Sequence, residues 1–197
     1  MNILHIDSSI SGANSVSRQL TASIVRQLTG LAPGAAVIYL DLSTHPVPQL
    51  GPGLLAAKMA GADDADAAAS AAALAAFMAA DVIVVGAPMY NFSIPSQLKA
   101  WIDSICVAGV TFSYSAAGPV GLCKDKRVII ASARGNVFSA PSPNAALDHQ
   151  ENYLRGVFGF LGIEQVEVIR AEGVAFGAEP RRLAMDAAMA DVDALTA

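Results

Sequence analysis

The sequence predicts an α/β protein with a doubly wound, five-stranded parallel sheet and helices on both faces, a three-layer αβα sandwich. Short apolar runs of strand character alternate along the chain with segments of helical character, which is typical of repeated βαβ units. Each crossover is long enough for a right-handed connection back to the same sheet. In the strand order 2-1-3-4-5, the switch point lies between the first and third strands, where such sheets bind ligands.

The first half of the chain supplies three strands and three helical segments. The strands are expected over Asn2 to Ile6, Ala36 to Leu40 and Val82 to Gly86. In the third, VIVVG, β-branched residues would fill both faces, which indicates a parallel strand buried on both sides. The helices are expected over Arg18 to Leu28, Leu54 to Met59 and Asp64 to Ala80.

The second half supplies the remaining strands, Arg127 to Ala131 and Gln165 to Arg170. Helices are expected over Ser96 to Cys106, His149 to Leu161 and Pro180 to the end of the chain. The residues from Ala108 to Lys126 form a long insertion that has strand-like residues and no helical period. An insertion of this length inside a compact domain is often functional.

The composition limits the size and the partners of the protein. The 197 residues fit a single domain, residues 1–197. Hydrophobic residues make up 54% of the chain and charged residues 15%, against about 25% charged in an ordinary domain, so we expect a homo-oligomer that buries apolar surface. The net charge of -5, without a cluster of basic residues, argues against binding to nucleic acid.

Cysteine content and hydropathy bear on the compartment. Cys106 and Cys123 are too few and too irregularly spaced for a disulfide framework or a zinc site, so we expect a reduced, cytoplasmic protein without a metal. The N-terminus enters an apolar strand directly, and no signal peptide is expected. The alanine-rich run from Ala67 to Ala80 is shorter than the roughly 18 apolar residues that span a bilayer, so no membrane association is expected.

Two loops at strand ends have the residues expected of a binding site. The loop from Asp7 to Ser17 is rich in hydroxyl groups and precedes a helix, whose N-terminus is a natural anchor for a phosphate. Serine and asparagine are also ordinary cap residues, and that alternative stays open. The loop has no G-x-G-x-x-G pattern and no P-loop lysine, so neither a dinucleotide fingerprint nor an NTPase is supported.

The second loop follows the third strand and reads APMYNFSIP, an aromatic-amide-aromatic run between two prolines. In the predicted topology it faces the hydroxyl-rich loop across a crevice, which Arg134 and Asn136 would border. These parts suit a ligand with one phosphate, held by uncharged donors, and a flat ring held by methionine and aromatic side chains. Flavin mononucleotide (FMN) fits this description.

Three segments make a resemblance specific: APMYNFSIPSQLKAWID, GVTFSYSAAGPVGL, and AEGVAFG at Ala171 to Gly177. They resemble the FMN-dependent NADH-azoreductase family, within the flavodoxin-like quinone reductases. The resemblance covers nearly the whole chain, and PMYNF is its most specific part. It implies a flavodoxin-like fold, a homodimer, and ping-pong transfer of a hydride from NADH through FMN to quinones and to azo bonds, which are cleaved reductively.

The resemblance also implies which residues bind FMN. The phosphate would be held by Ser9, Ser15, Ser17 and the backbone of Val16, and the isoalloxazine and ribityl chain would be lined by Met89, Tyr90, Asn91 and Phe92. A third segment corresponds to Ala133, Arg134, Gly135 and Asn136. It departs from the family pattern S/T-R-G-G, because Ala133 lacks the hydroxyl and Asn136 replaces a glycine.

No side chain is expected to act as a nucleophile or general acid, because the flavin itself takes and gives the hydride. Candidates for walls of the substrate pocket, some of them reaching the partner's flavin, are Phe112, Tyr114, Phe158 and Phe160, with plain core packing as an equal alternative. The rival function is that of a flavodoxin-type electron carrier, which binds FMN without being an enzyme. The modest acidity argues against it, because such carriers dock through a dense carboxylate surface.

Overall fold

The computed structural model describes residues 1–61 and 63–196, and a five-stranded parallel sheet forms its centre. Its strands are β1 (Asn2–Asp7), β2 (Ala36–Asp41), β3 (Val82–Pro88), β6 (Arg127–Ala133) and β7 (Gln165–Ala171). Their order is β2-β1-β3-β6-β7. Counted along the chain, this is the predicted order 2-1-3-4-5, and the predicted fold class is confirmed.

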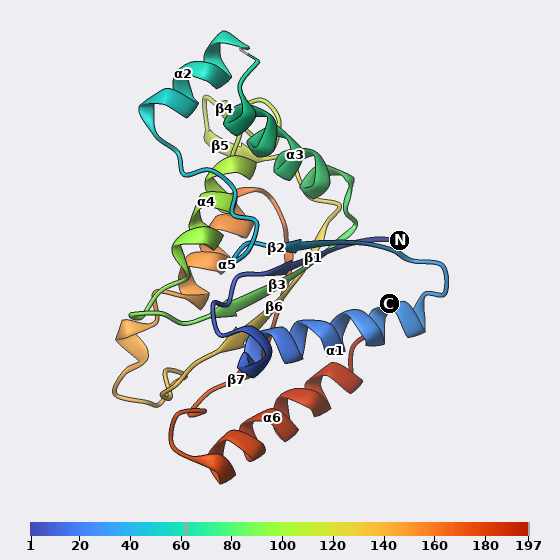
Figure 1. The fold of residues 1–197 in the computed structure, drawn as a ribbon, viewed down its shortest axis with the longest axis vertical. Helices are drawn as coiled ribbons and strands as arrows, with labels where there is room; N and C mark the ends of the chain where they lie inside the picture. Colours follow the sequence, from blue (N-terminus) through green and yellow to red (C-terminus); the bar gives the residue numbers. More distant parts are fainter. Residues whose placement is uncertain (62, 197) are drawn as a thin grey trace.

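Helices cover both faces of this sheet (Figure 1). On one face lie α1 (Val16–Leu31) and α6 (Ala178–Asp193), and on the other lie α3 (Ala65–Ala79), α4 (Ser96–Ile105) and α5 (Glu151–Phe160). The helix α2 (Pro52–Ala60) packs against α3 and projects from the body of the sandwich. Short 3-10 turns, η1 (Gly12–Asn14) and η2 (Ala145–Leu147), lie in the loops. None of the described helices combines the length and apolar character needed to cross a membrane.

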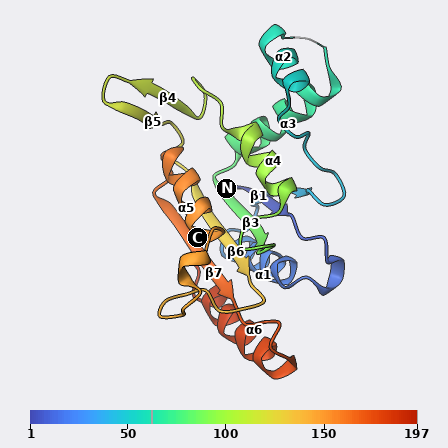
Figure 2. The same cartoon turned by 90° about the vertical axis from the view of Figure 1, so that its left-hand side faces the viewer.

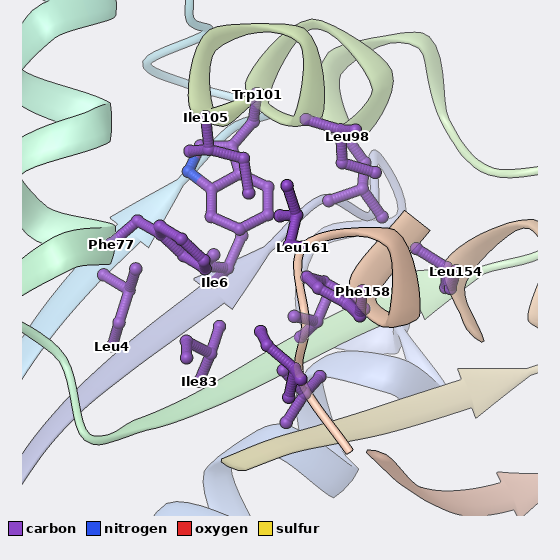
Figure 3. Packing of buried hydrophobic residues seen from close by; sticks show 14 of the residues in the cluster. Leu4, Ile6, Phe77, Ile83, Leu98, Trp101, Ile105, Leu154, Phe158 and Leu161 are labelled. Atoms are coloured by element: carbon purple, nitrogen blue, oxygen red, sulfur yellow. The ribbon is translucent and has the colours of Figure 1, made fainter. Parts of the chain in front are cut away.

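The central strand β3 is buried along its whole length, as its β-branched sequence predicts. The larger core cluster lies between the sheet and α3, α4 and α5, where Trp101 is fully buried and its ring meets Phe77 edge-on at 6.0 Å (Figure 3). A second cluster lies under α1 and α6. Burial of an aromatic side chain of this kind contributes about 2–3 kcal/mol, so these two cores fix the sheet and thereby its loops.

The bounds of most elements differ by a few residues from those predicted from the sequence. Strands β3 and β6 run two residues further than predicted, because their pairing continues to Pro88 and Ala133. The insertion Ala108 to Lys126 forms an antiparallel hairpin of β4 (Phe112–Ser115) and β5 (Gly118–Gly121), outside the main sheet. Figure 2 shows this hairpin projecting at the end of the molecule where α5 finishes.

Candidate functional site

A pocket of about 170 Å³ lies where the loops after β1, β3, β6 and β7 converge at the carboxyl edge of the sheet. This is the place where an open α/β sheet binds ligands. The pocket is lined by Ser9, Ser11, Asn14, Ser15, Val16, Ser17, Pro88, Met89, Tyr90, Ala133, Arg134, Gly135, Val174 and Arg181. The predicted cofactor residues line it with three exceptions, which are Asn91, Phe92 and Asn136.

One end of the pocket is a group of buried hydroxyls at the start of α1. Ser15 is the N-cap of this helix, and its Oγ accepts a hydrogen bond from the backbone N–H of Arg18 at 3.3 Å. The Oγ atoms of Ser15 and Ser17 lie 3.1 Å apart, and Ser9 is buried beside them. The first N–H groups of a helix have no acceptor within the helix, and together with the helix dipole they attract an anion. This end therefore fits a phosphate group.

Tyr90 joins the hydroxyl-rich loop to the loop after β3. Its Oη accepts a hydrogen bond from the N–H of Ile10 at 3.2 Å and lies 3.3 Å from Oγ of Ser9. The two loops that the sequence analysis placed opposite each other are thus in direct contact. Their contact fixes the distance between the hydroxyl end and the aromatic end of the pocket.

The residues Tyr90 to Ser93 form a tight turn at the rim of the pocket. The backbones of Tyr90 and Ser93 exchange hydrogen bonds of 2.9 and 3.1 Å. Between them, Asn91 and Phe92 have φ angles of 48° and 71°, as in a type I′ turn. The carbonyl of Phe92 accepts a hydrogen bond from the N–H of His149 at 3.1 Å. The ring of Phe92 packs edge-on against the ring of Phe138. The turn therefore has a fixed shape, although both central side chains are exposed.

The third wall comes from the loop after β6, through its backbone. The carbonyls of Arg134 and Gly135 accept hydrogen bonds from the N–H groups of Val174 and Ala175, at 3.2 and 3.0 Å. Within residues 1–61 and 63–196, the N–H groups of Gly135 and Asn136 donate to no protein acceptor. Free backbone donors beside a pocket fit the oxygen and nitrogen acceptors at the edge of a flavin ring.

Arg134 was predicted to bind the cofactor, but its guanidinium is turned into the protein. Its side chain has no exposed surface and forms ion pairs with Glu151, with Asp148 at 3.0 Å and with Glu172 at 3.6 Å. Its Nε donates to Oγ of Ser132 at 3.2 Å. Because the side chain is fully enclosed, Arg134 reaches the pocket through its backbone, and its charge is used to hold the surrounding loops.

The carboxylates around Arg134 connect the strand ends to each other. Burial would raise the pKa of Glu151, but its hydrogen bonds with Arg170 and the nearby Arg134 outweigh burial and lower the pKa. Glu172, which follows β7, accepts hydrogen bonds from the N–H groups of Phe138 and Ser139. The loops after β6 and β7 are therefore locked together behind the pocket wall.

The departure from the family pattern at Asn136 leaves the pocket intact. The side chain of Asn136 is exposed, and its Oδ1 accepts a hydrogen bond from the N–H of Val137 at 2.7 Å. The methyl group of Ala133 is buried at the end of β6. Both changes affect side chains, so the backbone donors that the pattern provides remain in place.

The aromatic candidates for the substrate pocket lie elsewhere in the chain. Phe158 is fully buried in the larger core, in keeping with the alternative of plain core packing. The rings of Phe112 and Phe160 lie 4.6 Å apart, and those of Phe112 and Tyr114 lie 5.5 Å apart. This cluster lies where α5 ends, whereas Gln150, just before α5, donates to the carbonyl of Ala87 beside the pocket. It is therefore about one helix length, roughly 15 Å, from the pocket of its own chain.

A wider hollow of about 700 Å³ lies beside the edge strand β2, but its charged groups are already paired. Arg18 donates to both oxygens of Asp41, at 2.9 and 2.7 Å, and the hydroxyl of Tyr39 donates to Asp7 at 3.0 Å. Groups that satisfy each other have little left to offer a ligand. The smaller pocket remains the candidate site.

Some residues that line the pocket were not among the predicted cofactor residues, namely Ser11, Asn14, Pro88, Val174 and Arg181. Arg181 is the one with a charge at the hydroxyl end, and it comes from α6, far along the chain from the hydroxyl-rich loop. The sequence contained a signal for Arg181, because the helix after the last strand also begins at the carboxyl edge of a parallel sheet, where ligands bind.

Comparison with known proteins agrees with the observed fold. A family model described as the flavodoxin-like fold matches residues 1–195. The chain is 57% identical over 192 residues to the FMN-dependent NADH:quinone oxidoreductase of Bradyrhizobium sp. (strain BTAi1), covering 95% of this chain and 96% of that protein. It is 55% identical over 201 residues to a protein of the same name from Laribacter hongkongensis (strain HLHK9), covering 99% and 100%.

Solved structures of azoreductases have a similar fold. The fold superposes on an azoreductase from Bacillus anthracis str. Sterne with a TM-score of 0.87 at 28% identity, covering 98% of this chain and 97% of that one. It superposes equally well, with a TM-score of 0.87 at 26% identity over 100% of both chains, on an FMN-dependent NADH-azoreductase from Bacillus anthracis str. Ames Ancestor in complex with FMN.

Proposed function

The chain belongs to the flavodoxin-like fold family, and from this premise we propose that it is an FMN-dependent NADH:quinone oxidoreductase that also cleaves azo bonds reductively. One structural observation carries the proposal. The buried hydroxyls at the N-terminus of α1 face the loop after β3 across one pocket, and free backbone N–H groups border it at Gly135. An anion site beside an aromatic wall with ring donors suits FMN.

The residues divide into those for the phosphate and those for the ring. Ser9, Ser15, Ser17 and the backbone of Val16 would hold the phosphate. Met89 and Tyr90 would lie along the flavin, and the N–H groups of Gly135 and Asn136 would donate to its polar edge. Asn91 and Phe92 would set the shape of the rim rather than line the pocket.

Hydride transfer from NADH to the acceptor is the chemistry that FMN supplies when it is bound. The protein contributes binding and electrostatics. Backbone donors held rigidly by Val174 and Ala175 favour negative charge at the ring edge, an effect of about 3 kcal/mol per donor in comparable preorganised sites. No nucleophilic or acidic side chain is needed.

We also propose that the protein is a homodimer. Tyr114 is 76% exposed and Met59 82% exposed, and a second copy would cover such apolar surface. In a dimer, Phe112, Tyr114 and Phe160 would lie near the pocket of the partner, whereas in their own chain they lie far from the pocket. Sedimentation equilibrium tests this proposal, and a monomer at micromolar concentration would contradict it.

A cytoplasmic location is likewise a proposal. It is supported by Cys106 and Cys123, which are both free thiols, in keeping with a reducing compartment. Cell fractionation tests it, and recovery outside the cytoplasmic fraction would contradict it.

The decisive experiment is a flavin and turnover assay on the purified protein. We expect a yellow protein that gains thermal stability from FMN and oxidises NADH with a benzoquinone or an azo dye as acceptor. A colourless protein that FMN does not stabilise would refute the proposal. A flavoprotein that ignores NADH but exchanges electrons with a reductase would support the electron carrier instead.

A further inference from the structure

Arg181 lies near the start of α6 and borders the hydroxyl end of the pocket. It lines this pocket together with Ser9, Ser15 and Ser17. Its Nη2 donates to the carbonyl of Asn14 at 3.0 Å, in the loop that precedes α1. The helix α6 runs beside α1 on the same face of the sheet (Figure 1), and the hydrogen bond to Asn14 brings Arg181 next to the N-terminus of α1.

The other donors at this end of the pocket are uncharged. They are serine hydroxyls and backbone N–H groups, supported by a helix dipole equivalent to roughly half an elementary charge. A phosphate monoester has a charge of about -2 near neutral pH. Arg134, the other arginine at the pocket, has its guanidinium enclosed among three carboxylates. The uncharged donors and the helix dipole offset only part of this charge, and Arg181 is in position to add a full positive charge.

Arg181 is also free to bind an anion. In the part of the chain that the structure describes, it forms no ion pair, and Asn14 accepts its one side-chain hydrogen bond. Most other arginines are paired with a carboxylate, namely Arg18, Arg127, Arg134, Arg170 and Arg182. An arginine has several N–H donors in a planar fork that matches a phosphate, so most of the donors of Arg181 remain available.

We propose that Arg181 binds the 5′-phosphate of FMN and makes the chain select FMN over riboflavin, which has no phosphate. This inference rests on the proposed FMN-dependent function. It adds one charged donor to the uncharged donors that are expected to hold the phosphate. The hydrogen bond to Asn14 places the guanidinium at the mouth of the phosphate loop before the ligand arrives, which limits the ordering needed on binding.

The test compares two flavins on two neighbouring arginine variants. Arg181→Gln removes the charge and keeps a polar side chain. Arg182→Gln is the matched control, because Arg182 is the next residue of the same helix but is exposed and paired with Glu179 and Asp186. The dissociation constants of FMN and riboflavin are measured by quenching of flavin fluorescence, for the wild-type chain, both variants and Arg181→Lys.

We expect Arg181→Gln to weaken FMN binding by roughly tenfold to hundredfold, the usual effect of losing a hydrogen bond between charged groups, and to leave riboflavin binding unchanged. Arg181→Lys should recover part of the loss, because it restores the charge without the fork. Arg182→Gln should bind both flavins as the wild type does.

Two outcomes would overturn the inference while the proposed function stands. One is an FMN affinity of Arg181→Gln within about twofold of the wild type. The other is an equal loss of affinity for FMN and riboflavin, which would mean that Arg181 only holds the loop at Asn14. A wild-type chain that binds neither flavin would instead refute the proposed function together with this inference.

Discussion

At the scale of single residues, the backbone of Asn91 and Phe92 is the most informative local feature. They are the non-glycine residues with positive φ in the described chain. Asparagine tolerates this conformation, but for a bulky residue such as phenylalanine it is an outlier, and such strain concentrates at binding sites. The conformation lets the chain reverse between Tyr90 and Ser93 while Tyr90 stays in contact with Ser9.

The turn therefore predicts a specific result for Asn91. Asn91→Ala should weaken FMN binding several-fold, because alanine disfavours the left-handed region by about 1 kcal/mol and the rim would shift. Asn91→Gly, which adopts positive φ freely, should bind FMN nearly as the wild type does. Asn144→Ala, in the loop after β6, is the control, and titration with FMN is the measurement. Equal effects of Asn91→Ala and Asn144→Ala would contradict a role for this turn.

At the scale of elements, the hairpin of β4 and β5 is held by a close approach of two backbones. A Cβ atom added at Gly121 would lie 2.1 Å from the nitrogen of Gly162 and 2.2 Å from the carbonyl carbon of Leu161. Gly121 ends β5 and Leu161 follows α5, and the N–H of Cys123 donates to the carbonyl of Leu161 at 2.9 Å. Only a glycine allows the hairpin to join the helix at this distance.

Two alanine substitutions should consequently have opposite effects on the free energy of unfolding. Gly121→Ala should lower it by about 2 kcal/mol or more, since the backbone must move apart. Gly156→Ala should raise it by about 0.5–1 kcal/mol, because Gly156 lies within α5 with no neighbour near its added Cβ and alanine favours a helix. Urea unfolding of both variants is the measurement. Similar values for the two variants would show that the close approach is not a constraint.

At the scale of the whole molecule, buried carboxylates make stability depend on pH. The pKa of Glu151 is lowered from its ordinary value of 4.5, and the pKa values of Asp7, Asp41 and Glu172 are lowered as well. A carboxyl group whose pKa is lower in the folded state stabilises the fold above its ordinary pKa. That stabilisation is lost as the pH falls through the folded-state value.

We therefore expect the urea midpoint to be constant from about pH 7 to 5 and to fall steeply from about pH 4.5 to 3. Glu151→Gln should be less stable than the wild type at pH 7, because Arg134 and Arg170 lose a charged partner, and the difference should shrink toward pH 3. Glu164→Gln, at an exposed position, is the control and should follow the wild-type curve. A Glu151→Gln variant whose deficit stays constant with pH would contradict this assignment.

The sequence alone determined the sheet and its order, and it named most of the expected cofactor residues that line the candidate pocket. Local patterns sufficed for this, because a buried strand such as Val82 to Gly86 and a hydroxyl-rich loop before a helix are recognisable within a few residues, and topology places their ends together. The apolar face of α5 also contained a signal for Phe158, which follows Leu154 by one helical turn and packs with it in the core.

Only the tertiary structure decided the roles of the arginines. Arg134 is enclosed because Asp148, Glu151 and Glu172 come to it from separate parts of the chain. Arg181 stays free of any carboxylate in the described structure and reaches Asn14, which lies at the other end of the sequence. A guanidinium binds whichever anion the fold brings near, and that neighbour depends on long-range packing that local patterns do not encode.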